Sequence, residues 1–244
     1  MNVKGYRTDL AYIHDAGHSA FALGAAPGLL RLLERQGIAS GLVVDLGCGS
    51  GRWARELNRA GYEVLGVDQS PAMIRLARRI APRSKFRVAS LLDAALPACD
   101  AITSMGECLN YCFDEANCRS ALLELFARAW EALRPGGVFI CDFATPARRP
   151  KSGVSNYSAV GPDWAVISAA ETLERPGLLC RRITSFRRAG RLYRRSEEVH
   201  YLRLYSARDI VADLDRCGFN ARVLRRYGAM RLPKGIAGVL AVKP

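Results

Sequence analysis

The sequence lacks the features of secreted, membrane-spanning and metal-binding proteins. It contains only three histidines, and its eight cysteines include no Cys-x-x-Cys pair. Neither a zinc-finger spacing nor a disulfide framework is expected, and we interpret the cysteines as reduced core residues. There is no apolar segment of the signal-peptide type and no apolar run of about eighteen residues. These absences predict a cytoplasmic protein with no membrane partner.

Signatures of nucleic-acid-binding modules are also missing, although the formal net charge is +13. No RNP-like aromatic motif accompanies the basic residues. Part of the excess charge lies in one segment rich in strand-forming residues, at Arg181, Arg182, Arg187, Arg188, Arg191, Arg194, Arg195 and Arg203. This pattern favours an arginine-rich, solvated strand face. An anionic substrate or a nucleic acid is the alternative partner.

Strands and helices alternate along much of the chain, which predicts an α/β domain with a doubly wound, mostly parallel sheet. With 244 residues, the chain can bury one sizeable core but is short for two domains. The expected strands are Leu42 to Leu46, Val64 to Val67, Phe86 to Val88, Ala101 to Ser104 and Val138 to Phe143. A helix from about residue 115 to Leu133 should end at the Pro135-Gly136 turn, because proline cannot continue a helix.

This alternation occupies residues 41–149 and is followed by a different pattern. In residues 150–205, helical periodicity gives way to strand-like runs, which predict an antiparallel β insert. The runs are Trp164 to Ala170, Leu178 to Phe186 and Leu192 to Leu204. Residues 206–244 should add a helix, starting at a capping box that begins at Ser206, and two strands. These strands are Phe219 to Leu224 and Ala237 to Val242.

Three glycines at alternate positions follow the first apolar strand, in the run Val43-Val44-Asp45-Leu46-Gly47-Cys48-Gly49-Ser50-Gly51. Such glycines let the backbone turn sharply and approach a ligand, toward which the amides of the next helix point. The second strand ends in Asp68, whose carboxylate is placed to accept two ribose hydroxyls. Ser70 and Pro71 then fit the N-cap and first position of a helix. Together these residues predict a nucleotide-type cofactor site.

The glycine spacing distinguishes two kinds of cofactor site. Dehydrogenases usually show Gly-x-Gly-x-x-Gly, whereas this chain has Gly47-x-Gly49-x-Gly51. The blocks Asp45-Leu46-Gly47-Cys48-Gly49-Ser50-Gly51 and Gly66-Val67-Asp68-Gln69-Ser70-Pro71-Ala72-Met73 closely resemble class I S-adenosylmethionine-dependent methyltransferases of the small-molecule type. The resemblance implies a Rossmann-like fold, S-adenosyl-L-methionine as cofactor, residues 1–40 as a helical lid, and an insert that forms much of the substrate pocket.

The same resemblance assigns residues to the cofactor. Gly47 to Gly49 would line its methionine part, Asp68 would hold the ribose, and Gln69 would border the adenine. Many relatives place an aspartate after the third strand to contact the adenine amino group, where this chain has Ser90. The expected cofactor-binding residues are Asp45, Gly47, Cys48, Gly49, Asp68, Gln69, Met73, Ser90, Leu91, Met105, Gly106 and Tyr12.

The catalytic candidates lie after the fourth strand and in the lid. A sulfonium methyl group is already electrophilic, so the enzyme mainly holds the acceptor and, for some nucleophiles, removes a proton. The resemblance puts Glu107, Asn110 and Tyr111 toward the methyl group. Glu107 could orient the nucleophile, take its proton or stabilise the sulfonium. The alternative is that it caps the next short helix, or contacts the cofactor without a catalytic part.

Histidines and insert residues complete the candidate set. His14 is a candidate base, with a structural role as the alternative. The strand around His200 alternates, with Tyr201 and Arg203 on the opposite face, and one face should meet the pocket. Arg203 could pair with an acidic substrate group or stand exposed. The catalytic candidates are therefore Glu107, His14 and Tyr111, and the substrate-binding candidates are Asn110, His200, Tyr201 and Arg203.

Missing motifs narrow the acceptor. The sequence has no Asn-Pro-Pro-Tyr of the base-methylating type and no lysine-centred tetrad of the ribose-methylating type. Asp142 stands alone where a catalytic metal would need grouped carboxylates, so no metal is expected. The sequence thus predicts methyl transfer to oxygen or nitrogen of a small molecule, with an anionic acceptor and a homodimer left open. The alternative is a protein that binds the cofactor without turnover, or that uses its basic insert on RNA.

Overall fold

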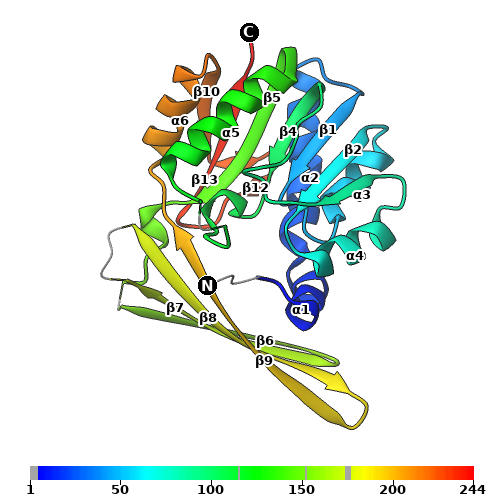
Figure 1. Ribbon diagram of the computed structural model, residues 1–244, viewed down its shortest axis with the longest axis vertical. Coiled ribbons are helices and arrows are strands. Elements are labelled where there is room, and N and C mark those ends of the chain that lie inside the picture. The colour runs from blue at the N-terminus through cyan, green and yellow to red at the C-terminus, as the bar shows by residue number, and fades with distance from the viewer. Residues whose placement is uncertain (1–4, 115, 152, 174–176) are drawn as a thin grey trace.

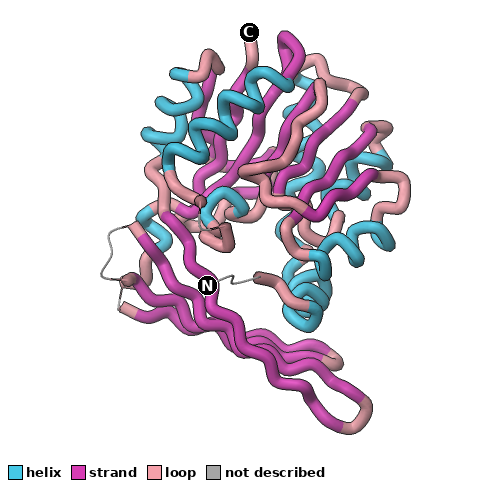
Figure 2. The backbone as a smooth tube through the Cα atoms, viewed as in Figure 1, coloured by secondary structure: helices cyan, strands magenta, loops and turns pink. Residues whose placement is uncertain are grey.

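The computed structural model describes residues 5–114, 116–151, 153–173 and 177–244. Within these residues the main sheet has seven strands in the order β10-β13-β5-β4-β1-β2-β3 (Figures 1 and 2). The strands are β1 Leu42–Leu46, β2 Glu63–Asp68, β3 Lys85–Val88, β4 Cys99–Ser104, β5 Leu133–Ala144, β10 Asn220–Leu224 and β13 Ile236–Val242. All neighbouring pairs among β1 to β5 are parallel, and β13 runs antiparallel to β5 and β10. The predicted doubly wound, mostly parallel sheet is confirmed.

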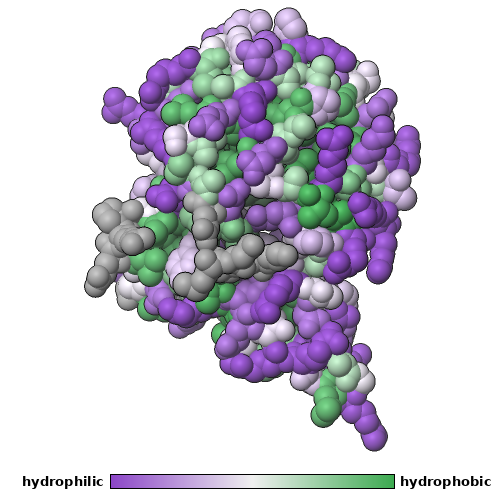
Figure 3. All heavy atoms as spheres, in the orientation of Figure 1, coloured by the Kyte–Doolittle hydropathy of each residue, from purple (hydrophilic) through white to green (hydrophobic). Residues whose placement is uncertain are grey.

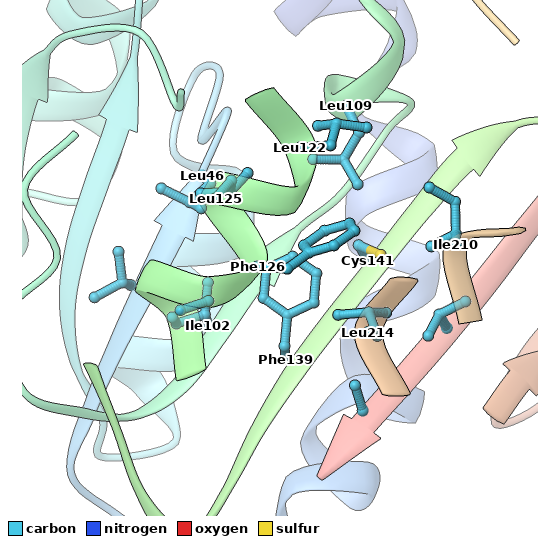
Figure 4. Close-up of a cluster of buried hydrophobic side chains, with 14 of the residues drawn as sticks. Leu46, Ile102, Leu109, Leu122, Leu125, Phe126, Phe139, Cys141, Ile210 and Leu214 are labelled. Atoms are coloured by element: carbon cyan, nitrogen blue, oxygen red, sulfur yellow. The ribbon is translucent and has the colours of Figure 1, made fainter. Parts of the chain in front are cut away.

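Helices cover both faces of this sheet, because alternate strand residues point to opposite sides. They are α1 Thr8–His18, α2 Ala20–Arg35, α3 Arg52–Arg59, α4 Pro71–Ile80, α5 Arg119–Ala132 and α6 Ala207–Arg216, with the short 3-10 helices η1 Cys108–Asn110 and η2 Pro146–Arg148. On one face, Phe126 of α5 and Leu214 of α6 share a buried cluster with Phe139 of β5 (Figure 4). On the other face, α2 and α3 bury Leu33 and Leu57 in a second cluster. None of the described helices has the length and hydropathy that a membrane crossing needs.

Four antiparallel strands form the insert, β6 Val154–Gly161, β7 Trp164–Thr172, β8 Leu178–Ala189 and β9 Leu192–Arg203. They make a separate sheet in the order β6-β7-β8-β9, which projects as an arm below the main sheet in Figure 1. Hydrophilic side chains cover much of the visible face of the molecule, including this arm (Figure 3). Sequence reasoning predicted the last three strands and missed β6, which is polar, largely exposed and without apolar alternation.

The predicted lid separates into two parts with different packing. Helix α1 contacts α4 and the insert strands β6, β7 and β8. Helix α2 instead packs on the main sheet and against the short strands β11 Arg226–Tyr227 and β12 Met230–Arg231. The first four residues of the predicted lid lie outside the described residues. Of residues 1–40, α1 lies against the insert and α2 belongs to the core of the main sheet, and the lid itself stays a prediction.

Local signals predicted some helix starts and not others. Ser70 caps α4 as expected, because its hydroxyl accepts a backbone hydrogen bond from that helix and Pro71 occupies the first turn. The capping box at Ser206 is wrong, since its side chain makes no cap hydrogen bond to α6. Residue 115, where the next helix was expected to begin, lies outside the described residues, and the helix starts at Arg119.

Candidate active site

A cavity of about 740 Å³ opens at the carboxyl ends of β1, β2, β3 and β4. Its opposite wall comes from α1, the residues before α1, and the insert strands β6, β7 and β8. In an open α/β sheet, ligands bind outside the carboxyl ends of the strands at the point where the strand order reverses. This point lies between β1 and β4 here, so the cavity is where the fold predicts a ligand.

The turn after β1 brings bare backbone to the cavity. Gly47 and Gly49 have φ angles of +77° and +52°, in the left-handed region that favours glycine. The amides of Gly47 and Cys48 donate to the carbonyl of Val67, which ties the turn to β2. A Cβ on Gly47 would lie 2.4 Å from Cys108 Sγ, so a larger residue does not fit. At Gly49 an added Cβ would meet no atom of the described residues within 4 Å, so the φ angle is what favours glycine there.

Asp68 ends β2 and lines the cavity. Its Oδ2 accepts the amide of Gly49 at 2.9 Å, and its Oδ1 accepts the amide of Ser70 at 2.8 Å. Each oxygen keeps a lone pair, so two neighbouring hydroxyls of a ligand can donate to the carboxylate. Burial raises the pKa of Asp68 to about 6, although the two amides act in the opposite direction.

A second buried carboxylate, Asp45 of β1, lines the cavity beside the glycine turn. Its Oδ1 accepts the hydroxyl of Thr103 at 2.8 Å, and Trp53 donates its indole N–H to that same hydroxyl at 3.2 Å. Burial raises the pKa of Asp45 to about 7. A carboxylate at this point suits the ammonium group of an amino-acid ligand.

Asp142 of β5 shapes the turn after β4. Its Oδ1 accepts the amides of Gly106 and Glu107, each at 2.8 Å, and its Oδ2 accepts the hydroxyl of Tyr227 at 3.3 Å. These bonds hold Glu107 at a φ of +64°, which is uncommon for residues other than glycine. Glu107 makes no cap hydrogen bond to η1, so the capping alternative is wrong. Burial raises the pKa of Asp142 to about 7.

An ion pair joins Glu107 to the insert. Arg181 of β8 places Nη2 2.8 Å from Oε2 and 3.1 Å from Oε1 of Glu107, and its Nη1 donates to the Tyr111 hydroxyl at 3.2 Å. Arg148 Nε lies 3.3 Å from Glu107 Oε1. The side chains of Arg181 and Glu107 are only 15% and 12% exposed. The Glu107 oxygens are thus already bonded to cations, which suits an anchor for Arg181 better than a free proton acceptor.

Rings from the N-terminal segment complete this end of the cavity. The Tyr6 hydroxyl lies 2.9 Å from the Tyr111 hydroxyl, and the His14 ring packs edge-on against Tyr6 at 5.1 Å. His14 also stacks on His18, with ring centroids 5.7 Å apart. Burial, with a smaller effect of His18, lowers the pKa of His14 to about 4, so its ring is neutral at neutral pH. The three catalytic candidates, His14, Glu107 and Tyr111, all line the cavity.

Two predicted substrate residues, Asn110 and His200, are buried and do not line the cavity. The Asn110 amide bonds the backbone of Ala144 through both its nitrogen and its oxygen, which ties η1 to β5. His200 Nε2 lies 2.8 Å from Glu198, and its ring packs edge-on against Phe113. Both side chains already have partners within the fold, so we revise their predicted role from substrate binding to structure.

Three further candidates also lie outside the cavity lining. Tyr201 is exposed and Arg203 is half-buried. The Tyr12 hydroxyl donates to Asp163 at 3.1 Å, and the Arg187 guanidinium stacks 3.1 Å from the centre of its ring. The expectation that a face of β9 meets the pocket is corrected. The insert meets it through β6, β7 and β8, because β9 packs against the segment after η1.

Every predicted cofactor residue except Tyr12 lines the cavity. Sequence reasoning did not assign to the site the lining residues Tyr6, His18, Trp53, Asp114, Arg148, Tyr157 and Arg181. For Arg181 one signal was available, since it alternates with the apolar residues Leu179 and Ile183 on one strand face. Tyr6, Asp114, Arg148 and Tyr157 reach the cavity from segments far apart in the chain, which periodicity does not indicate. No three His, Cys, Asp or Glu side chains in the described parts of the chain gather as metal ligands.

Known proteins resemble this chain in its core and in its fold. Residues 43–137 match a family described as a methyltransferase domain. A ubiquinone biosynthesis O-methyltransferase from Alkalilimnicola ehrlichii is 34% identical over 123 residues, which make up 48% of this chain and 46% of the relative. The chain thus spans about half the length of the curated relatives it matches.

Solved structures resemble nearly the whole chain. An S-adenosylmethionine-dependent methyltransferase from Clostridium acetobutylicum has a TM-score of 0.81 and 19% identity, over 95% of this chain and 96% of its own. An amino pentose methyltransferase from Micromonospora echinaspora has a TM-score of 0.75 and 18% identity, over 98% of both chains. At these identities the likeness shows a shared fold.

Proposed function

We propose that this chain, whose residues 43–137 form a methyltransferase domain within a class I fold, transfers a methyl group from S-adenosyl-L-methionine to oxygen or nitrogen of a small molecule. One observation carries the proposal. The Asp68 carboxylate stands beside a glycine turn in a large cavity, with one lone pair free on each oxygen. The Rossmann-like fold with an antiparallel insert after β5, predicted from the sequence, is confirmed by the topology and by the solved structures it resembles.

The donor groups around the cavity fit S-adenosyl-L-methionine from one end to the other. Asp68 would hold the two ribose hydroxyls. The backbone from Gly47 to Gly49 would hold the amino-acid tail, and Asp45 would face its ammonium group. The adenine would lie beyond Asp68, toward Ser90 at the end of β3. When bound, the cofactor supplies an electrophilic methyl group, so the protein's main task is to position the acceptor.

His14 is the residue we propose to receive a proton from the acceptor. Its ring lines the cavity and is unprotonated at neutral pH, because burial lowers its pKa to about 4. The same shift makes the ring a weak base, which suits an acceptor proton that becomes acidic only as the new bond to the methyl group forms. An acceptor amine must lose a proton before it can attack, and a phenol or alcohol benefits from a nearby base. Glu107 would instead hold Arg181 and Tyr111 in place against the acceptor.

The wall built by the insert supports a small acceptor. Its side chains combine apolar and polar groups, including Ile183, Ser168 and Tyr157. A cavity of about 740 Å³ falls within the size range of small-molecule sites. The names of two similar proteins, an amino pentose methyltransferase and a ubiquinone biosynthesis O-methyltransferase, also support a small-molecule acceptor. We therefore propose a hydroxyl or amino group on a ring as the methyl acceptor.

The alternative of an RNA-binding insert has less support. Besides Arg181, four arginines of the insert form ion pairs, namely Arg182 with Glu171, Arg187 with Asp163, Arg194 with Asp9, and Arg195 with Glu197. Arginines that are already paired contribute less to binding phosphate. All eight cysteines are unpaired, which supports our proposal of a reducing compartment, the cytoplasm. The homodimer stays a prediction.

Mass spectrometry of an acceptor panel tests this function. The protein would be incubated with S-adenosyl-L-methionine and with phenols, catechols and amino sugars. We expect S-adenosylhomocysteine to form with at least one acceptor, whose mass rises by one methyl group. A His14→Gln variant should lower kcat more than it raises KM, because the proton acceptor is lost. Failure of the protein to bind the methyl donor would refute the proposal.

A further inference from the structure

The hydroxyl of Ser90, in the loop after β3, already donates its proton to another side chain. The Ser90 hydroxyl donates to Asp114 Oδ2 at 2.7 Å, and the same hydroxyl oxygen accepts the amide of Leu92 at 3.1 Å. A serine hydroxyl has a single proton to donate. The Ser90 hydroxyl therefore has no proton left to donate to a ligand. Its partner, the Asp114 carboxylate, lines the cavity and is the group that can accept a hydrogen bond there.

Asp114 reaches this point from the loop between η1 and α5. The groups bonded to its carboxylate in the described structure are the Ser90 hydroxyl on Oδ2 and the amide of Ala116, which donates to Oδ1 at 2.9 Å. A carboxylate offers about four lone-pair positions, so both oxygens can accept another donor. Asp114 lines the cavity, as do Ser90 and Leu91.

The strand order decides which part of the ligand lies there. The glycine turn follows β1, Asp68 ends β2 and Ser90 follows β3, and these three strands are neighbours in this order. A ligand whose amino-acid tail lies on the glycine turn and whose ribose lies on Asp68 therefore places its base beyond β2, over the end of β3. This is the end of the cavity that holds the Ser90–Asp114 pair.

We propose that Asp114 accepts a hydrogen bond from the 6-amino group of adenine and that Ser90 positions its carboxylate. The pair makes the site selective for a purine that donates at position 6 over one that carries a carbonyl oxygen there. An oxygen would face the carboxylate with lone pairs against lone pairs, and the carboxylate would stay unsatisfied. This inference rests on the proposed function, since it assumes that the cavity binds S-adenosyl-L-methionine.

Calorimetric titration with two ligands tests the proposal on the whole protein. S-adenosylhomocysteine carries the 6-amino group, and S-inosylhomocysteine carries oxygen at the same position. We expect the unmodified protein to bind the adenosyl compound about 50-fold more tightly than the inosyl compound. In Asp114→Asn the preference should fall at least about tenfold, because an amide can turn its NH₂ group toward the oxygen. The ratio of the two affinities does not depend on the fraction of the variant that is folded.

Two further variants complete the experiment. Ser90→Ala should weaken binding of the adenosyl compound by about threefold to tenfold and reduce the preference in part, because the carboxylate loses its positioning bond. Asp93→Asn removes a carboxylate from an exposed residue of the loop that carries Ser90, and it should change neither affinity. An unchanged preference in Asp114→Asn, or an equal loss for both ligands, would overturn the role of Asp114 and leave the proposed function standing. Failure of the unmodified protein to bind either ligand would overturn both.

Discussion

At the scale of single residues, the carboxylates around the cavity differ in their partners. In the described parts of the chain, Asp45, Asp68 and Asp142 accept hydrogen bonds from uncharged N–H and O–H donors, and burial raises the pKa of each. Glu107 is bonded to the guanidinium of Arg181. The first three carboxylates can therefore accept hydrogen bonds from a ligand, whereas Glu107 forms the ion pair that links the core to the insert.

Breaking that link should cost stability. Arg181→Met should lower the free energy of unfolding by about 2 kcal/mol, because among the described residues Glu107 would keep only the partly exposed Arg148 as a cationic partner. Arg182→Met provides the matched control, since this neighbouring side chain is 63% exposed and should change stability by less than about 0.5 kcal/mol. Urea unfolding compares the two variants. Equal stabilities would contradict the structural role of the pair.

The same contrast explains which residues could be predicted. The glycine turn and Asp68 were predicted because their signal is local, a strand followed at once by a special residue. The contacts of Arg181 and Tyr6 with Tyr111 span 70 and 105 residues of chain, and those of Asn110 with Ala144 span 34. Periodicity carries no information on such partners, so Arg181 and Tyr6 were not assigned to the site and Asn110 was given a role it does not fill.

At the scale of elements, the turn between β1 and α3 has to combine a left-handed backbone with close packing. Gly47→Ala tests this, because the new methyl group would lie 2.4 Å from Cys108 Sγ at a φ of +77°. Gly37 after α2 has nearly the same φ, +76°, but open space around it. Gly37→Ala should cost about 1 kcal/mol from backbone strain and keep the affinity for S-adenosylhomocysteine.

Gly47→Ala should cost more, about 2–4 kcal/mol, and weaken S-adenosylhomocysteine binding at least about tenfold, because the turn must move to relieve the contact. Chemical unfolding and calorimetry measure both quantities. If the two variants behaved alike, the packing of Gly47 against Cys108 would have no part in forming the site.

Elements with apolar periodicity were predicted well, whereas elements that depend on contacts with the rest of the fold were not. Strand β1 was predicted with its observed bounds, and β2 to β5 were predicted with shorter bounds than those observed. Strand β6 was missed because its polar sequence does not indicate a strand. Its antiparallel pairing with β7 is what holds it extended. Ser206 has the residue pattern of a capping box, yet its side chain does not cap α6, so the helix starts without that bond.

At the scale of the whole molecule, three parts of the chain meet around one cavity. The main sheet brings the glycine turn and Asp68, the insert brings Arg181, and the N-terminal segment brings Tyr6 and His14. The Tyr6 amide donates to Glu198 of β9, so this segment is attached to the insert as well. The cavity is therefore a property of the assembled fold.

Buried carboxylates also make the stability of the fold depend on pH. The pKa values of Asp45 and Asp142 are raised to about 7, so the folded chain binds these protons more tightly than the unfolded chain. Their contribution to stability is therefore largest at low pH. It decreases as the pH rises from about 4 to about 7, by up to about 1.4 kcal/mol per pH unit for each group. His14, with its pKa lowered to about 4, acts in the opposite direction between about pH 4 and 6.5.

Comparison with Asp142→Asn isolates one of these groups. The amide oxygen can still accept the two backbone N–H groups, but the side chain no longer titrates. The free energy of unfolding at pH 8 minus that at pH 5 should therefore be more positive in the variant than in the unmodified protein. The same difference in both proteins would show that Asp142 is not protonated in the fold at pH 5.

The most direct measurement is the affinity for S-adenosylhomocysteine, determined by calorimetry at pH 7.5, when the carboxylate at the end of β2 is removed. Asp68→Ala should weaken binding by about 30-fold or more, because two ribose hydroxyls lose a charged acceptor. Glu63→Ala removes an exposed carboxylate from the opposite end of the same strand and should leave the affinity unchanged. An Asp68→Ala protein that is folded and binds as tightly as the unmodified protein would contradict the account.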